Sequence, residues 1–410
     1  MNPLPKTAWY CRLCHQMVAG IPRIHLGSQA LTAFADAPGT GEYAPLELVE
    51  CPVCSLVQLR YEVSRDRLYR GFYPYLSGMN RTMVRALGDL TGVIEQEIKL
   101  KAGDVVLDIG CNDGTMLASY RTPALSLVGF EPSPHAADLT AGRKIQVIRS
   151  YFAGELAPIS PKARVITAVA MFYSVDDPMK FMRGVASSLA SGGVFVLQMN
   201  DLASMLSGAS YDIIGHEHLC YYGMASLRWM LDMCALEIYR VEHFPLNGGT
   251  ARYWIGHARE HPIEPSVANQ IDIERSLLGD TGWEAFQEQV ERSRDATRSA
   301  VFDVLADGGR VYGYGAATRG STILQTCGLD ASMISGLADI DPRKIGKYLA
   351  GPDIPVVSEQ EAREKASLFL VLPYSYAEEF ILRESEFIAG GGQLFFPLPA
   401  PRLVGRQTEL

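Results

Sequence analysis

The strongest constraint on the fold is an apolar run at residues 105–110 that leads into a glycine turn. This run predicts a buried strand that carries Asp108 towards its carboxyl end. Gly110 and Gly114 then permit a tight turn with close approach of the backbone to a ligand. Similar short apolar runs follow at 125–132, 145–150, 163–172 and 192–200. Segments long enough for helices separate most of them, so the pattern predicts a parallel sheet covered on both faces.

Two cysteine pairs near the start of the chain have the spacing of a metal site. Two residues separate the cysteines of each pair, which lets both thiolates face one ion, and two pairs complete a tetrahedral shell. The predicted ligands are Cys11, Cys14, Cys51 and Cys54. Because all four ligands are protein groups and no position stays open, the predicted ion is a structural Zn²⁺. The alternative, two redox pairs, needs a helix-initiating α/β context that this segment lacks.

The chain divides into four parts around these features. Glycines and a proline between the cysteine pairs predict a loop-rich first part. A strand–turn–strand unit at 236–258 is expected to close the parallel sheet with antiparallel partners, and a strand at 310–316 starts a second α/β series. The predicted fold class is therefore α/β. Its parts are a small zinc-binding N-terminal module (1–70), a parallel-sheet domain (71–262), connecting helices (263–302) and a C-terminal α/β domain (303–410).

The net charge of −9 argues against nucleic acid or an anionic membrane as a partner, because such partners favour a basic surface. A local basic pocket for a phosphorylated small molecule remains compatible with this charge. No apolar run reaches the roughly 18–20 residues of a membrane span. The first residues also lack the basic and then apolar layout of a signal peptide. A cytoplasmic location is therefore expected.

A second acidic residue, Glu131, lies near the end of the predicted strand at 125–132, about twenty positions after Asp108. A carboxylate at that position can accept hydrogen bonds from both hydroxyls of a ribose. A glycine turn with a distant acid fits two enzyme classes, those that bind dinucleotides and those that transfer methyl groups. The turn here contains no GxGxxG motif, which is the form suited to a pyrophosphate.

A dense group of proton-transfer residues follows the fifth predicted strand, on the ligand edge of the sheet. His216 and His218 flank Glu217, and Tyr222 lies close by in the sequence. A histidine titrates near neutrality and can remove an activated proton, and a neighbouring carboxylate can orient its ring. Metal binding is the alternative. An extended His-Glu-His segment would place alternate side chains on opposite faces, and the HExxH motif is absent.

These motifs, taken in order, resemble the sugar C-methyltransferases of deoxysugar and antibiotic biosynthesis. The resemblance covers nearly the whole chain and includes the cysteine pairs and the segments 72–78, 107–115, 215–222, 247–252, 313–325 and 340–359. It implies a zinc module, a class I methyltransferase sheet of Rossmann-like type, and a C-terminal Rossmann-like domain. By the resemblance, that last domain helps to hold a nucleotide-linked sugar and does not bind a nicotinamide.

The resemblance implies an S-adenosylmethionine-dependent reaction at carbon 3 of a 4-keto-deoxysugar carried on a nucleoside diphosphate, usually thymidine. A base removes the proton beside the ketone, and the enolate attacks the sulfonium methyl. By the motif, His218 is the base, Glu217 orients it or binds the sugar, and His216 is a further proton-transfer candidate. Tyr75 and Tyr73 are candidates to lie over the reacting centre, with Tyr75 donating to the oxyanion.

The remaining candidate residues follow from the same resemblance. The predicted cofactor-binding residues are Asp108, Gly110, Asn112, Asp113, Gly114, Glu131, Pro132, Met171 and Phe172. The predicted substrate-binding residues are Tyr73, Tyr222, Asn247, Tyr314, Arg319 and Ser321. Among these, Arg319, Tyr314 and the backbone around Ser321 are the candidates for phosphate contacts, from charge and glycine-turn geometry.

The chain departs from the family pattern at three places. Gly215 stands where a tyrosine is frequent, Ser174 where a histidine is usual, and Arg319-Gly-Ser where lysine-glycine-asparagine is usual. These changes leave the acceptor open. The alternatives are a C-methyltransferase for another enolisable natural product, a non-catalytic zinc-containing interaction protein, and a nicotinamide enzyme. The intact motifs argue against the second, and the short glycine run at 313–316 argues against the third.

Overall fold

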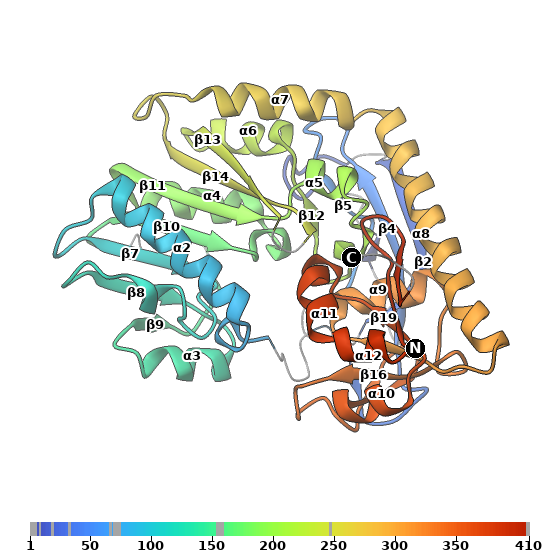
Figure 1. The fold of residues 1–410 in the computed structure, drawn as a ribbon. Helices are drawn as coiled ribbons and strands as arrows, with labels where there is room; N and C mark the ends of the chain where they lie inside the picture. The colour runs from blue at the N-terminus through green and yellow to red at the C-terminus, as the bar shows by residue number, and fades with distance from the viewer. Residues whose placement is uncertain are drawn as a thin grey trace.

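The computed structural model describes residues 6–7, 10–17, 20–31, 34–64, 68, 75–152, 160–245 and 248–406. The predicted α/β class is confirmed (Figure 1). Within these residues, no helix is long and apolar enough to cross a membrane.

A seven-stranded sheet forms the centre of the first large domain. In spatial order its strands are β13 (Leu236–Phe244), β14 (Thr250–His257), β11 (Leu189–Met199), β10 (Ala163–Val169), β7 (Val105–Ile109), β8 (Ser126–Phe130) and β9 (Gln146–Ile148). The last five run parallel, whereas β14 is antiparallel to both of its neighbours. The predicted antiparallel closure is therefore confirmed. The chain order reverses between β7 and β10, and ligands of open α/β sheets bind outside such a switch point.

Helices cover both faces of this sheet. On one face, α2 (Arg81–Ile98) packs its apolar stripe on Val106, Val165 and Val196. The side chain of Asn80 caps this helix by accepting from the backbone N–H groups of residues 82 and 83. On the other face, α4 (Pro178–Ser188) packs on the alternate strand residues. Shorter helices complete the domain: α3 (Pro134–Ala141), α5 (Leu202–Ser207) and α6 (Met224–Asp232).

The N-terminal part is richer in strands than the sequence predicted. β2 (Ile21–Ala30), β4 (Tyr43–Glu50) and β5 (Val57–Leu59) form an antiparallel sheet that includes β12 (Cys220–Tyr221) from the first large domain. The prediction of an irregular loop between the cysteine pairs was wrong. Ile24 and Leu26 are buried at alternate positions of β2, which is the pattern of a half-buried strand. Gly27, at φ +78°, lies where the strand register shifts and does not end the strand.

Two helices connect the large domains. α7 (Pro265–Leu277) runs along the first domain, and α8 (Asp280–Ala306) continues down the side of the molecule to the second (Figure 1). The second domain has parallel strands in the order β20 (Gln393–Phe396), β19 (Leu368–Val371), β15 (Val311–Tyr314), β16 (Ile334–Asp339) and β18 (Ile354–Ser358). Its helices are α9 (Thr318–Thr326), α10 (Glu359–Lys365), α11 (Ala377–Arg383) and α12 (Ser385–Ala389).

The edges of the second sheet are antiparallel. β21 (Arg402–Val404) pairs with β20, and β17 (Tyr348–Leu349) pairs with β18. β17 also pairs with β3 (Phe34–Ala35) from the N-terminal part. The N-terminal part therefore contributes backbone hydrogen bonds to both large domains, through β5 with β12 and through β3 with β17.

Candidate active site

The loop after β7 has the conformation that close approach of a ligand requires. Gly110, Asn112 and Gly114 all adopt positive φ, at +74°, +51° and +75°. A Cβ on Gly110 would lie 3.0 Å from Cγ of Met171, so Met171 borders the loop. Behind the loop, the carboxylate of Asp108 accepts a 2.6 Å hydrogen bond from the hydroxyl of Thr167. Burial raises the pKa of Asp108 to about 7.

Glu131 connects this loop to the next one. It lies at the end of β8 and is 7% exposed. One carboxylate oxygen accepts the N–H of Asn112 (2.9 Å), and the other accepts the N–H of Ser133 (2.7 Å). Burial raises the pKa of Glu131. Each oxygen has a second lone pair, so the carboxylate keeps the capacity to accept from two ribose hydroxyls.

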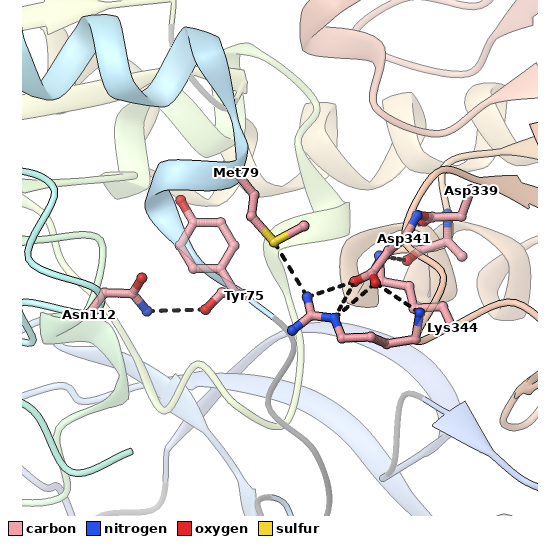
Figure 2. A network of polar contacts seen from close by, with 8 residues as sticks. Tyr75, Met79, Asn112, Asp339, Asp341 and Lys344 are labelled. Atoms are coloured by element: carbon pink, nitrogen blue, oxygen red, sulfur yellow. Dashed lines mark hydrogen bonds and ion pairs between the residues drawn. The ribbon is translucent and has the colours of Figure 1, made fainter. Parts of the chain in front are cut away.

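Two of the predicted cofactor residues use their side chains to hold a neighbouring segment. The amide of Asn112 accepts from the N–H of Ser77 (2.9 Å) and donates to the carbonyl of Tyr75 (3.1 Å; Figure 2). Asp113, which is buried, accepts from the N–H of Gly78 (2.8 Å). A Cβ on Gly78 would lie 2.6 Å from that oxygen, so the approach requires glycine. The loop after β7 thereby fixes the backbone of Tyr75, whose side chain is 43% exposed.

Segment 75–79 also meets the second large domain (Figure 2). The guanidinium of Arg343 lies 3.5 Å from the sulfur of Met79 and forms an ion pair with Asp341. Lys344 pairs with Asp339 at 2.9 Å. Both cations follow the carboxyl end of β16, so charged groups of the second domain lie next to the segment that carries Tyr75.

Several predicted ligand contacts are packed inside the protein. Phe172 is fully buried and stacks on Tyr222, with ring centroids 4.8 Å apart. Tyr314 is also buried and donates its hydroxyl to Glu384 (2.8 Å). Ser321 is 8% exposed and accepts from the amide of Gln325 (2.9 Å) within α9. These four predicted residues (Phe172, Tyr222, Tyr314 and Ser321) therefore contribute to packing, and we do not include them among the proposed contacts to the cofactor or the acceptor.

Pro132 is exposed at the start of the loop after β8. Tyr73 and Asn247 lie outside the described residues.

The His218 ring is held in one tautomer. Its Nδ1 lies 2.6 Å from the carbonyl oxygen of Ile213, in η4 (Tyr211–Ile213). Because a carbonyl only accepts, Nδ1 carries the hydrogen and Nε2 presents a lone pair. The ring packs on Tyr173, with centroids 4.1 Å apart. Burial, with a contribution from the positive charge of Arg319, lowers the pKa of His218 to about 4, so the ring is neutral near pH 7.

The His-Glu-His segment is a turn and not an extended strand, because the N–H of His218 donates to the carbonyl of Gly215 (3.1 Å). The side chain of His216 is 5% exposed and packs beside the backbone of Gln29 and Ala44 in the N-terminal sheet. The N-terminal sheet therefore covers the His216 ring. Glu217 is half-buried, and burial raises its pKa to about 7.

Arg319 lies at the start of α9, next to the switch point of the second sheet between β15 and β19. Its guanidinium forms a 2.7 Å ion pair with Asp212, whose side chain is 2% exposed. Tyr374, which follows β19 and lies in η6 (Tyr374–Tyr376), donates to the other oxygen of Asp212 (3.0 Å). Asp212 and Tyr374 were not among the residues predicted from the sequence. The signal for Tyr374 was the apolar run at 366–372 that ends just before it, because ligands of open α/β sheets bind at the carboxyl ends of strands.

The four cysteines of the two pairs converge at one point. Their Sγ atoms all lie within 4.8 Å of one another. The closest pairs, Cys11 with Cys54 and Cys14 with Cys51, are 3.4 and 3.6 Å apart, too long for disulfides. A tetrahedral Zn²⁺ with Zn–S bonds of about 2.3 Å separates its sulfurs by about 3.8 Å, so the donor set fits this ion.

The cysteine cluster is linked to the His218 turn through the N-terminal sheet. The N–H of Leu59 in β5 donates to the carbonyl of Leu219 (3.0 Å). On the cluster side, the N–H of Arg12 donates to the side chain of Gln58 (3.0 Å), which lies in the same strand. Strand β5 is therefore hydrogen-bonded both to Arg12, which lies between Cys11 and Cys14, and to Leu219, the residue after His218.

Two family models match successive parts of the chain. Residues 79–240 match a family described as methyltransferase domain, and residues 245–399 match the C-methyltransferase C-terminal domain. C-methyltransferase NovU of Streptomyces niveus is 31% identical over 383 residues, which cover 92% of this chain and 91% of the relative.

Solved structures with some similarity include two methyltransferases. One is an S-adenosylmethionine-dependent methyltransferase from Clostridium acetobutylicum ATCC 824, with a TM-score of 0.34, 15% identity, and coverage of 47% of this chain and 96% of that one. The other is the plantazolicin methyltransferase BpumL bound to a desmethylPZN analog and SAH, with a TM-score of 0.34, 14% identity, and coverage of 42% and 84%. From the whole-length relative and the two domain matches, the chain belongs to the C-methyltransferase family and is an S-adenosylmethionine-dependent C-methyltransferase.

Proposed function

We propose that this enzyme methylates the carbon beside a ketone, and that its acceptor is a dTDP-linked 4-keto-deoxysugar methylated at carbon 3. The observation that carries the reaction type is the Nδ1–H bond of His218 to the Ile213 carbonyl. It leaves a neutral Nε2 as a base at the boundary between the two large domains. The sugar and the nucleotide rest on the motif resemblance described above.

We propose that S-adenosylmethionine lies over the loop after β7. Gly110 and Gly114 allow the backbone to approach it, Glu131 accepts from the ribose hydroxyls, and Met171 borders its methionine end. When bound, the cofactor supplies an electrophilic methyl group. Asn112 and Asp113 contribute indirectly, because they hold the segment that carries Tyr75.

In the proposed reaction, Nε2 of His218 takes the proton from the carbon next to the ketone. Negative charge then develops on the ketone oxygen, and a hydrogen-bond donor there lowers the barrier. The hydroxyl of Tyr75 and the half-buried acid Glu217 are the candidate donors. With its pKa raised to about 7, Glu217 is partly protonated at neutral pH and is able to donate.

The nucleotide part of the acceptor is proposed to lie along segment 75–79, towards the loop after β16. Arg343 places a partly exposed guanidinium there, and Lys344 follows it. Gly215 adds room on the His218 side, because a Cβ on this residue would have no atom within 4 Å. That space favours, as the second candidate, a C-methyltransferase whose acceptor carries a larger group beside the ketone.

We propose a structural Zn²⁺ at Cys11, Cys14, Cys51 and Cys54. The convergence of four sulfurs with no further protein ligand among the described residues supports a closed site.

Loss of the Glu131 carboxylate is expected to weaken cofactor binding. Glu131→Ala should lower the affinity for S-adenosylhomocysteine by about 1–3 kcal/mol, the scale for hydrogen bonds to a buried charge. That corresponds to about a 5- to 150-fold rise in Kd, measurable by calorimetry. Glu131→Gln, which keeps one acceptor oxygen, should lose less. Unchanged affinity in Glu131→Ala would mean that the ribose binds elsewhere.

The acceptor is tested by mass spectrometry in deuterated water. We expect the enzyme, given S-adenosylmethionine and a dTDP-4-keto-6-deoxy sugar, to add one methyl group at carbon. Without the cofactor, deuterium should enter at carbon 3, and His218→Ala should abolish both changes. Deuterium uptake without methylation would identify a poor substrate. Neither change in the wild-type enzyme would exclude this sugar and favour the larger acceptor.

A further inference from the structure

The buried carboxylate of Asp212 receives side-chain hydrogen bonds from two residues of the C-terminal domain. Nε and Nη2 of Arg319 both lie 2.7 Å from Oδ2, and the hydroxyl of Tyr374 donates to Oδ1 at 3.0 Å. The Asp212 side chain is only 2% exposed, so its negative charge depends on these two residues for compensation.

The same domain holds the residues on both sides of Asp212. The hydroxyl of Tyr374 lies 3.1 Å from that of Ser210, and the hydroxyl of Thr322 donates to the carbonyl of Ile214 (3.1 Å). Positions 210, 212 and 214 are thus all contacted by side chains from α9 or η6. Between them lies Ile213, whose carbonyl is the partner of Nδ1 in His218.

We propose that Arg319, Tyr374 and Thr322 are positioning residues, through which the C-terminal domain fixes the Ile213 carbonyl and with it the tautomer and direction of the catalytic histidine. Arg319 acts through Asp212 and not by contact with the acceptor. The C-terminal domain therefore contributes to proton abstraction as well as to binding. The effect on turnover rests on the function proposed above for His218.

Charge reinforces this arrangement. The ring of His218 packs on Tyr173 from η3 (Phe172–Ser174), and Arg319 from α9 acts on it through its charge. Glu217 is its neighbour in the sequence. Of these, Arg319 carries a permanent positive charge, which disfavours protonation of the imidazole. Replacing Arg319 by a neutral residue removes that charge and leaves Asp212 without a cationic partner, and both changes favour the protonated ring.

The test compares Arg319→Gln with the conservative Arg319→Lys. Protein labelled with ¹⁵N-histidine reports the tautomer and pKa of His218 without any acceptor, and the spectrum of His218→Ala assigns the signal. We expect wild type to show the Nδ1–H tautomer. Arg319→Gln should raise the His218 pKa and mix the tautomers, and Arg319→Lys should restore most of the wild-type behaviour.

Kinetics provide the second readout. For an acceptor that is turned over, Arg319→Gln should lower kcat about 10- to 100-fold, the scale for a misplaced catalytic group, with little change in KM. The acidic limb of its pH profile should move to higher pH. An unchanged ¹⁵N signal with raised KM and normal kcat would overturn the inference and make Arg319 an acceptor contact.

A milder variant guards against loss of folding. Thr322→Val keeps the ion pair and removes only the bond to the Ile214 carbonyl, so it should broaden or shift the His218 signals while S-adenosylhomocysteine still binds. A wild-type His218 spectrum in both Thr322→Val and a folded Arg319→Gln would rule out positioning by α9. If wild type shows the Nδ1–H tautomer but methylates no keto sugar, the proposed acceptor fails and the positioning inference stands.

Discussion

Replacement of His218 by alanine is expected to lower methyl transfer by about 10²- to 10⁴-fold, the usual contribution of a general base. Loss of a single neutral hydrogen bond costs only about 0.5–1.5 kcal/mol, or about 2- to 12-fold, so the two roles can be told apart by magnitude. Binding of S-adenosylhomocysteine should not change, because His218 does not contact the loop after β7 in the described contacts. His25→Ala, an exposed histidine of β2, is the matched control.

The pH dependence gives a second check on the same residue. A base works only when unprotonated, and the pKa of His218 is lowered to about 4. Activity that depends on it should therefore be complete above about pH 6 and decline as the pH falls through 4. A change of rate near pH 7 belongs to a different group, and Glu217 is the candidate, since its pKa is raised to about 7. Turnover of His218→Ala within tenfold of wild type would remove His218 from the base role.

Loss of the four-cysteine site is expected to have the largest effect on stability. Structural Zn²⁺ sites in small domains contribute about 10–16 kcal/mol of apparent binding free energy at pH 7. Cys51→Ser, or removal of the metal by a strong chelator, should therefore unfold the N-terminal sheet and lower Tm. Because β5 pairs with β12, methyl transfer should fall together with Tm. The measurements are metal content and thermal unfolding.

The matched control for this experiment is Cys234→Ser. Cys234 is half-buried and lies outside the cysteine cluster. The Cys234→Ser protein should retain one Zn²⁺ per chain and a Tm close to that of wild type. A wild-type protein that contains no zinc and keeps its Tm in chelator would show that the cluster is not a structural metal site.

Both α/β domains could be predicted from the sequence because each of their strands produces a pattern within a few adjacent residues. A buried parallel strand is a short apolar run, and the runs at 105–110 and 163–172 mark β7 and β10 closely. The sheet of the N-terminal part could not be predicted in the same way. β2 alternates buried and exposed residues and contains Gly27, so its pattern is close to that of a polar loop.

Some residues of the candidate site could likewise be named from the sequence, and others could not. Residues such as Gly110 and His218 could be named as candidates from the sequence, because a glycine turn and a titrating ring each have chemistry of their own. Aromatic residues could not be assigned, because Phe172 is equally compatible with a ligand contact and with the core in which it lies. The Asp212–Arg319 pair spans two domains, and no local pattern reports a partner so distant in sequence.

The position of the N-terminal sheet has a consequence for synthesis of the protein. Strand β5 ends at residue 59, but its neighbour β12 begins at residue 220. Strand β3 ends at residue 35, and its partner β17 begins at residue 348. At about 5–20 residues per second, the ribosome delivers these partners roughly ten seconds to one minute later. During that interval the nascent chain exposes unpaired strand edges, which favour aggregation. Early metal capture by the cysteine pairs would leave these edges open, so recombinant yield should depend on chaperone capacity as well as on zinc supply.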